Sequence, residues 1–311
     1  CELGRIESVQ YLIDGGIDVG MGGDEAIRCA VEYGQFDVVK LLVLHGADLY
    51  IGVNELLSRA CRIGHMGLVL YLIGLELDIH FCSPLYTATS HGHIDIVRIL
   101  VEAGARPSDM DVELLGIASS RGYLEILKFL VEAGLDLRAG NDAALNRAVK
   151  CGQVSVVRYL GSCGVDPNAR NGDIFVHACR SHNFAIIKYL IHIGANVSTQ
   201  YNRPLREAIE HGRVDIATYL VHCGANVHYN MSYSFLSACR TGHHGTLRFL
   251  VSRGVDVRVN NDEALYHAIE HDRAGVVEIL MSTMQHDAYT LRRMNCIATA
   301  RGRCEIAWII Y

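Results

Sequence analysis

The segment "AVEYGQFDVVKLLVLHGADL" (residues 30–49) decides the fold of this protein, because the chain repeats it. The segments "AVKCGQVSVVRYLGSCGVDP" (148–167) and "AIEHGRVDIATYLVHCGANV" (208–227) have the same order of an alanine, a glycine, an apolar run and a second glycine. Their spacing corresponds to a period of 30 residues. Such a period is typical of proteins that stack many copies of one small structural unit.

One small residue marks the same position in every unit. It recurs every 30 residues, apart from a single interval of 28 between Ala60 and Ala88. We expect only a small side chain to fit there, because two short helices must approach the neighbouring unit closely and protein interiors are tightly packed. The positions are Ala30, Ala60, Ala88, Ala118, Ala148, Ala178, Ala208, Ala238, Ala268 and Ala298.

Each unit has the pattern of two helices. The first is expected to run about nine residues and to end at a glycine in the left-handed conformation, as at Gly34, with Asp272 and His182 as tolerable replacements. The second carries apolar residues on one stripe, and an Asp or Asn soon after its closing glycine suits a side-chain-stabilised turn. Candidate N-caps of the first helices are Asp24, Asn54, Asp142 and Asp262.

The recurring leucines indicate how the units bury their apolar faces. They run from Leu42 to Leu280 in the second helices, with Leu12 and Ile310 in register at the two ends. One helix pair cannot bury such a face alone, but stacked pairs can. The sequence therefore predicts an all-α solenoid with a single array over residues 1–311 and about ten repeats.

This pattern resembles the ankyrin repeat over essentially the whole chain. The best local matches to its T-P-L-H-x-A motif are "SPLYTA" (83–88) and "RPLREA" (203–208). Ankyrin units usually have 33 residues, and the three missing here fall between the second glycine and the next helix. The resemblance implies an ankyrin-type helical-pair solenoid with shortened β-hairpin fingers.

The shortened unit is similar to the large ankyrin families of giant amoeba-infecting, mimivirus-like viruses. That similarity implies a location in the cytoplasm, and in the host cytoplasm if the chain is viral. The chain begins at Cys1 and ends at Tyr311 within a predicted helix. We therefore interpret it as a fragment truncated at both ends.

Composition argues against several classes of function. A formal net charge of −6 and 7% aromatic residues give no basic surface for nucleic acid. No apolar run approaches the ~18–20 residues of a membrane span. Eleven cysteines without a C-x-x-C pattern fit reduced thiols better than a disulfide framework. We expect a monomer that binds neither nucleic acid nor membrane.

One short motif suggests catalysis. His267, Glu270 and His271 form an H-x-x-E-H, the spacing of one class of zinc peptidase. The segment "EAIEHG" (207–212) shows that the repeat produces most of this motif without the first histidine. Zinc catalysis also needs a third ligand and a cleft that excludes water. The sequence thus predicts no enzyme, cofactor or metal, and a metal-dependent hydrolase using His267 and His271 is the less favoured alternative.

With no catalytic constellation, the expected function is a protein-protein interaction scaffold. Ankyrin proteins bind partners on a concave face built from the fingers and the ends of the first helices. A second alternative is the substrate-recognition arm of a ubiquitin-ligase adaptor, with an effector module such as an F-box outside these residues. The resemblance places the partner-binding residues at Glu32, Tyr33, Arg62, His91, Arg121, Lys150, Arg180, Glu210, His211, Arg240, Glu270 and His271.

A local run of charged residues indicates what kind of partner segment such a scaffold would bind. Arg121, Lys150 and Arg180 each stand at one of the two positions before the residue that ends the first helix, in three successive units, and Glu32 and Glu210 flank this run. An acidic or mixed-charge segment of a partner could lie across such a run. The alternative is an ordinary solvated face.

Overall fold

The computed structural model describes residues 5–19, 25–47, 49, 52–75, 82–181, 183–229, 231–255, 263–283 and 287–311. Throughout these ranges the chain forms helices joined by turns and contains no β-strand, which confirms the predicted all-α fold. Contacts divide it into two compact units, Cys1–Leu160 and Gly161–Tyr311. The predictions for Asp24, His182 and Asp262 lie outside the described residues.

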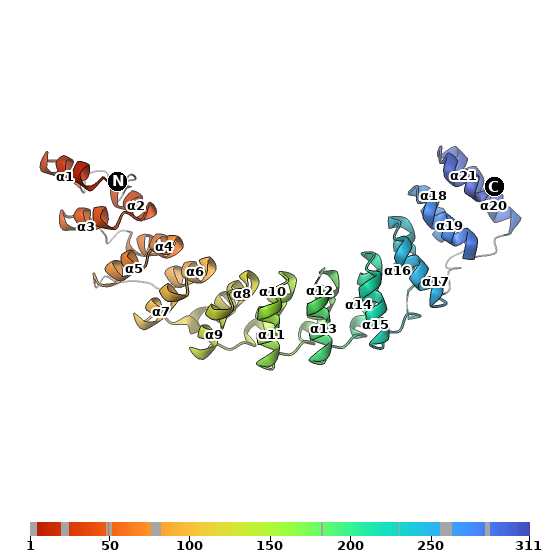
Figure 1. Ribbon diagram of the computed structural model, residues 1–311, viewed down its shortest axis with the longest axis horizontal. Coiled ribbons are helices and arrows are strands. Elements are labelled where there is room, and N and C mark those ends of the chain that lie inside the picture. The colour runs from red at the N-terminus through yellow and green to blue at the C-terminus, as the bar shows by residue number, and fades with distance from the viewer. Residues whose placement is uncertain are drawn as a thin grey trace. The chain divides into compact units, whose positions relative to one another are not determined.

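The first unit consists of helix pairs, and Figure 1 labels its helices. The first helices of its pairs are α2 (Glu25–Glu32), α4 (Val53–Ile63), α6 (Cys82–His91), α8 (Asp111–Arg121) and α10 (Ala139–Lys150). The second helices are α1 (Ile6–Asp14), α3 (Phe36–Leu44), α5 (Met66–Ile73), α7 (Ile94–Glu102), α9 (Leu124–Glu132) and α11 (Val154–Ser162). A 3₁₀ turn, η1 (Pro107–Met110), precedes α8.

The second unit repeats this arrangement. Its first helices are α12 (Asp173–Arg180), α14 (Thr199–Glu210), α16 (Ser232–Thr241), α18 (Glu263–Glu270) and α20 (Ala288–Ala300). Its second helices are α13 (Phe184–His192), α15 (Val214–His222), α17 (His244–Ser252), α19 (Ala274–Thr283) and α21 (Cys304–Ile310). A 3₁₀ turn, η2 (Arg170–Gly172), precedes α12.

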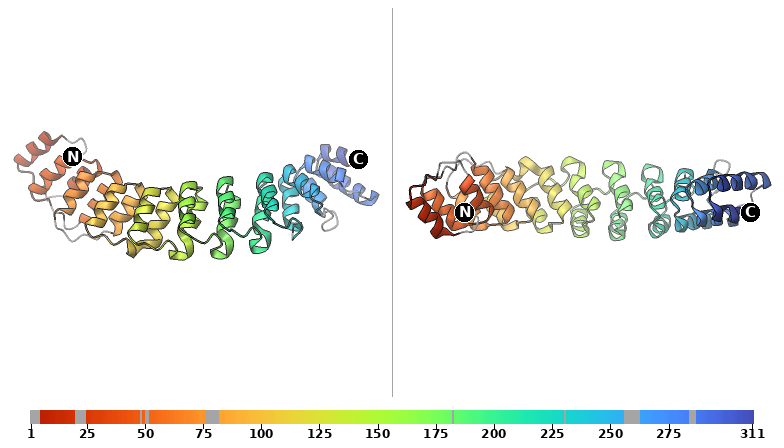
Figure 2. Two further views of the ribbon diagram at one scale, coloured as in Figure 1. Left: turned by 60° about the horizontal axis from the view of Figure 1, so that its bottom comes forward. Right: turned by 90° about the horizontal axis from the view of Figure 1, so that it is seen from above.

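Within each unit, like helices pack on like helices. In the first unit α2, α4, α6, α8 and α10 contact one another in sequence, and in the second unit α12, α14, α16, α18 and α20 do the same. The turned views of Figure 2 show neighbouring pairs side by side in each unit. This is the nearest-neighbour cohesion that a repeat array requires.

The residues that mark the repeat form the core. The ten alanines that recur with the repeat, here called the register alanines, are all fully buried. This confirms that a small side chain is needed where the helices meet. The second-helix leucines are buried too, but Leu12 in α1 remains 49% exposed. The apolar stripes therefore become a core wherever a neighbouring pair covers them.

The helix ends follow the predicted backbone rule. The glycines that close first helices have positive φ, as at Gly64 (φ 77°), and Asp272 takes the same conformation (φ 58°) in place of glycine. The cap prediction for Asn54 was wrong, because Asn54 lies inside α4, which begins after Gly52. Asp142 directly precedes the right-handed part of α10 and has φ 57°, and its role as a cap stays a prediction.

The connection that replaces the ankyrin finger has two parts. The first is the predicted side-chain turn, in which a backbone N–H donates to the carboxyl or amide oxygen two residues earlier. These bonds join Arg138 to Asp136 (2.9 Å), Asn168 to Asp166 (2.8 Å), Ser198 to Asn196 (2.9 Å) and His228 to Asn226 (2.9 Å).

The second part is a three-residue turn in the left-handed conformation. It occupies residues 140–142 in the first unit and residues 170–172 and 200–202 in the second. Its residues are mostly Gly, Asn and Asp, which tolerate positive φ best. The shortened finger is therefore a compact turn, and its described residues contain no hairpin strand.

The described cysteines behave as small buried or surface residues. None of these ten forms a disulfide, and burial raises the pKa of the Cys61 and Cys239 thiols to about 12. Such thiols stay protonated at neutral pH and are poor nucleophiles. Among the described helices, none has the length and apolar character needed to cross a membrane.

Candidate functional site

The predicted surface residues lie at or just beyond the C-terminal ends of the first helices. Tyr33 is 56% exposed, and Arg121 and Lys150 are exposed as well. Arg121 and Lys150 belong to the first unit and Arg180 to the second, so the predicted charge run is divided between the two units. Its role as one partner-binding surface stays a prediction.

In the first unit, two of the predicted surface residues, Glu32 and Arg62, form a contact between successive repeats. The carboxylate of Glu32 at the end of α2 accepts hydrogen bonds from Arg59 and Arg62, both on α4. Arg59 also donates to Glu55 at 2.7 Å. Glu32 and Arg62 therefore hold neighbouring repeats together, while His91 is exposed and its Nδ1 lies 2.9 Å from the Thr87 carbonyl oxygen.

In the second unit, a buried carboxylate that the sequence analysis missed organises the surface. Glu207 is only 7% exposed, and Arg180 donates to its two oxygens at 2.5 and 2.7 Å. Arg203 lies 3.4 Å away on the same helix. Burial alone would raise the pKa of Glu207, but hydrogen bonds and charge from the two arginines outweigh it and lower that pKa.

The other predicted residues of this unit also have intramolecular partners or lie at the surface. Glu210 accepts a hydrogen bond from the Ser234 hydroxyl at 3.1 Å. His211 is exposed, and its Nδ1 lies 2.9 Å from the Glu207 carbonyl oxygen. Arg240 is exposed at the end of α16. Much of the predicted charge is thus engaged between or within repeats.

A different part of the second unit offers an open, neutral surface. A pocket of about 680 Å³ lies over the turns that replace the fingers. Its lining carries amide, hydroxyl and aromatic side chains and no ionisable acid or base apart from the tyrosine phenols. The lining residues are Asn171, Asn196, Ser198, Thr199, Gln200, Tyr201, Asn202, Asn226 and Tyr229.

Two tyrosines dominate this pocket. The rings of Tyr201 and Tyr229 stack with centroids 6.2 Å apart and an interplanar angle of 12°, and Tyr201 is 74% exposed. Tyr201 also has φ 58°, although the matching central residues of the other left-handed turns are Asn141 and Asn171. A bulky residue is a conformational outlier there, and such outliers gather at functional sites.

The turn beneath the tyrosines is held from both sides. Asn202 is only 4% exposed, and its amide donates to the Asn226 carbonyl oxygen at 3.0 Å. On the other side, the Gln200 amide donates to the Asn171 carbonyl oxygen at 2.9 Å. Neighbouring repeats therefore fix the strained turn and present Tyr201 to solvent.

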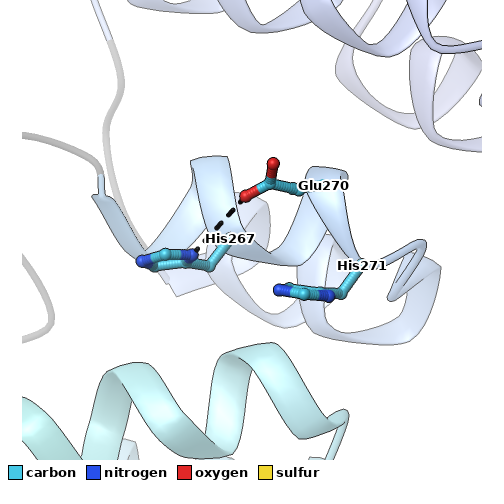
Figure 3. Close-up of side chains that lie close together, drawn as sticks. All are labelled: His267, Glu270 and His271. Carbon is cyan, nitrogen blue, oxygen red and sulfur yellow. Dashed lines mark ion pairs between the residues drawn. The ribbon is translucent and has the colours of Figure 1, made fainter.

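The H-x-x-E-H segment, on α18 and the residue that follows it, forms a second cluster. One ligand atom from each of His267, Glu270 and His271 lies within 4.8 Å of the other two. Figure 3 shows the imidazole rings side by side and the Glu270 carboxylate turned toward His267. The structure thus places the Glu270 carboxylate, which the motif already contained, beside the histidine pair as a candidate third donor.

Comparison with known proteins places the repeat in a family. A family model for ankyrin repeats in three copies matches residues 108–171 and 169–231, and a model of the single ankyrin repeat matches residues 22–52 and 80–112. Together they cover more than half of the chain. A search of curated protein sequences finds no match.

A solved structure supports the same assignment at the level of the fold. The human ASB11 ankyrin repeat domain superposes with a TM-score of 0.54 at 20% sequence identity, over 64% of this chain and 98% of that one. With its repeat period, buried register alanines and matching family models, the chain belongs to the ankyrin-repeat family.

Proposed function

We propose that this protein is an interaction scaffold whose second unit binds a partner protein over the pocket around Tyr201 and Tyr229. The family supports the general function, because ankyrin repeats are typically non-catalytic modules for protein binding. The observation that carries the specific proposal is Tyr201 itself. An exposed aromatic ring sits on a strained turn where the equivalent turns have asparagine.

The chemistry of the pocket suits a protein segment with little charge. Tyrosine is enriched among the residues that dominate binding energy, because it offers a large rigid surface with one polar group. The surrounding amides and hydroxyls can donate to and accept from a peptide backbone. We therefore expect recognition by aromatic contact and hydrogen bonds, with a weak dependence on salt.

The charged residues of the first unit provide the contrasting surface. Arg121 and Lys150 are exposed there, and the sequence analysis expects them to attract an acidic or mixed-charge segment. Binding at that surface would weaken strongly as salt rises. Salt dependence and mutation together therefore distinguish the two locations.

The test is selection of peptides from a displayed library on the purified protein, followed by affinity measurements on variants. Tyr201→Asn should weaken binding at least tenfold without loss of stability, because asparagine tolerates the left-handed conformation. Tyr229→Ser should also weaken binding. The matched control is Arg121→Glu with Lys150→Glu, which should leave the affinity unchanged; loss of binding in this control alone would contradict the proposal.

A further inference from the structure

We infer that His267, Glu270 and His271 form a binding site for a transition-metal cation of the zinc class. His267 and Glu270 lie on α18 and His271 directly follows its last residue, with the imidazole rings stacked at 6.4 Å between centroids and tilted by 21° (Figure 3). Their ligand atoms already lie within 4.8 Å of one another. Small side-chain rotations then bring three donors to a common ion.

The surroundings of His267 prepare one ring nitrogen for a metal. Its Nε2 lies 3.5 Å from the carboxylate of Glu263, one helical turn earlier. A proton on Nε2 would face this carboxylate and leave the lone pair on Nδ1 for a metal, as in the carboxylate–histidine–metal arrangement. Nδ1 is buried, has no hydrogen-bond partner among the residues that the structure describes, and lies 4.0 Å from Glu270 Oε2. A metal ion would satisfy this buried acceptor.

Glu270 can contribute one oxygen without losing its existing contact. Its Oε1 lies 3.3 Å from the Arg301 guanidinium, whereas its Oε2 faces His267. Arg301 therefore orients the carboxylate and leaves the second oxygen directed at the histidines. Glu263 and Glu270 place two carboxylates within 4.0 Å of the His267 ring.

The donor set selects the class of ion. Two imidazoles and one carboxylate suit zinc, copper, nickel or iron, whereas calcium and magnesium prefer oxygen ligands throughout. Three protein ligands leave one tetrahedral position for water. His271 is exposed, so an ion can reach the site from solvent. The inference concerns binding and assigns no hydrolytic step.

The chain contains its own control for this site. The segment "EAIEH" (207–211) has the same spacing, but Glu207 replaces the first histidine and is held by Arg180 and Arg203. That segment lacks the second imidazole and has two arginines beside its carboxylate. It should bind the ion weakly or not at all.

The experiment is calorimetric titration of the purified, reduced protein with zinc chloride, with cobalt(II) absorption as a second probe. We expect one zinc equivalent that is lost, or weakened at least tenfold, in both His267→Gln and His271→Gln, whereas His211→Gln binds as the wild type does. Because His267 and His271 are not fully buried, circular dichroism should show unchanged helix content in the variants.

Two further measurements make the outcome decisive. Cobalt bound by imidazole and carboxylate shows d–d bands without the thiolate charge-transfer band that cysteine ligation produces. Glu263→Gln should keep the stoichiometry and weaken zinc binding by about tenfold, the effect of losing an orienting group. A zinc equivalent that persists unchanged in His267→Gln, or a thiolate band in the wild type, would overturn the inference.

Discussion

Two five-residue segments of the second unit, "EAIEH" (207–211) and "HAIEH" (267–271), differ at one position. Both present a fully buried alanine and isoleucine to the core, Ala208 with Ile209 and Ala268 with Ile269. Their surfaces nevertheless differ in charge. The first holds a carboxylate between two arginines, and the second holds an imidazole between two carboxylates.

The difference in surface charge depends on the residue one helical turn earlier as well as on Glu207 and His267 themselves. Arg203 stands four residues before Glu207, whereas Glu263 stands four residues before His267. Residues four apart face each other on a helix, so a guanidinium lies beside the Glu207 carboxylate and a carboxylate lies beside the His267 ring. The comparison shows that one repeat backbone can present an ion-paired surface in one place and a cation-binding cluster in another.

The largest expected effect concerns the buried residues that the two segments have in common. Ile209→Ala and Ile269→Ala each remove a fully buried side chain and should lower the free energy of unfolding by about 2–5 kcal/mol. Urea denaturation followed by circular dichroism measures both. A loss in one variant and none in the other would show that the two cores are not equivalent.

The next effect separates the two surfaces. Glu207→Gln removes the charge that Arg180 and Arg203 share and should cost about 1–2 kcal/mol, because a buried charge-assisted hydrogen bond is lost. His267→Gln without metal should change stability by less than about 0.5 kcal/mol, because that imidazole is partly exposed. Equal losses in urea denaturation would remove the distinction between the segments.

The pH dependence should follow Glu207. Its pKa in the folded protein lies below the ordinary 4.5, so the folded state binds that proton less readily than the unfolded state. The stability difference between wild type and Glu207→Gln should be complete above pH 4.5 and shrink as pH falls through the lowered pKa. A difference that grows on acidification would contradict the ion-pair assignment.

The smallest effect concerns the Arg301–Glu270 pair, which is partly exposed. Arg301→Met should lower stability by less than about 1 kcal/mol, and added salt should reduce even this loss. Urea denaturation at low and high sodium chloride provides the measurement. If the free energy of unfolding fell by several kcal/mol regardless of salt, the Arg301–Glu270 pair would be behaving as a buried ion pair.

Much of the fold could be predicted because the same residue types recur at the same positions of each repeat. The alanine spacing located ten fully buried positions in the described helices, and the glycine positions located the ends of first helices, including the replacement Asp272. The left-handed turn at residues 200–202 was not predicted. Its conformation at Tyr201 depends on bonds from neighbouring repeats, which overcome the local preference of the residue.

The candidate site was less predictable. Positions at the ends of the first helices were located, but the sequence could not show that Glu32 and Arg180 bind partners 27 to 30 residues away. Glu207 gave one available signal, because it lies 27 residues after Arg180 and directly before a register alanine. The Tyr201–Tyr229 pocket gave none, since it depends on how two turns stack.

The sequence by itself determined the helix pairs, their order and their buried face, because those features depend on local periodicity repeated every 30 residues. Only the tertiary structure decided which surface side chains are engaged and which are presented to solvent. That outcome depends on atoms from adjacent repeats meeting within hydrogen-bond distance. These contacts depend on the positions of side chains in space, which the order of residue types along the chain does not specify.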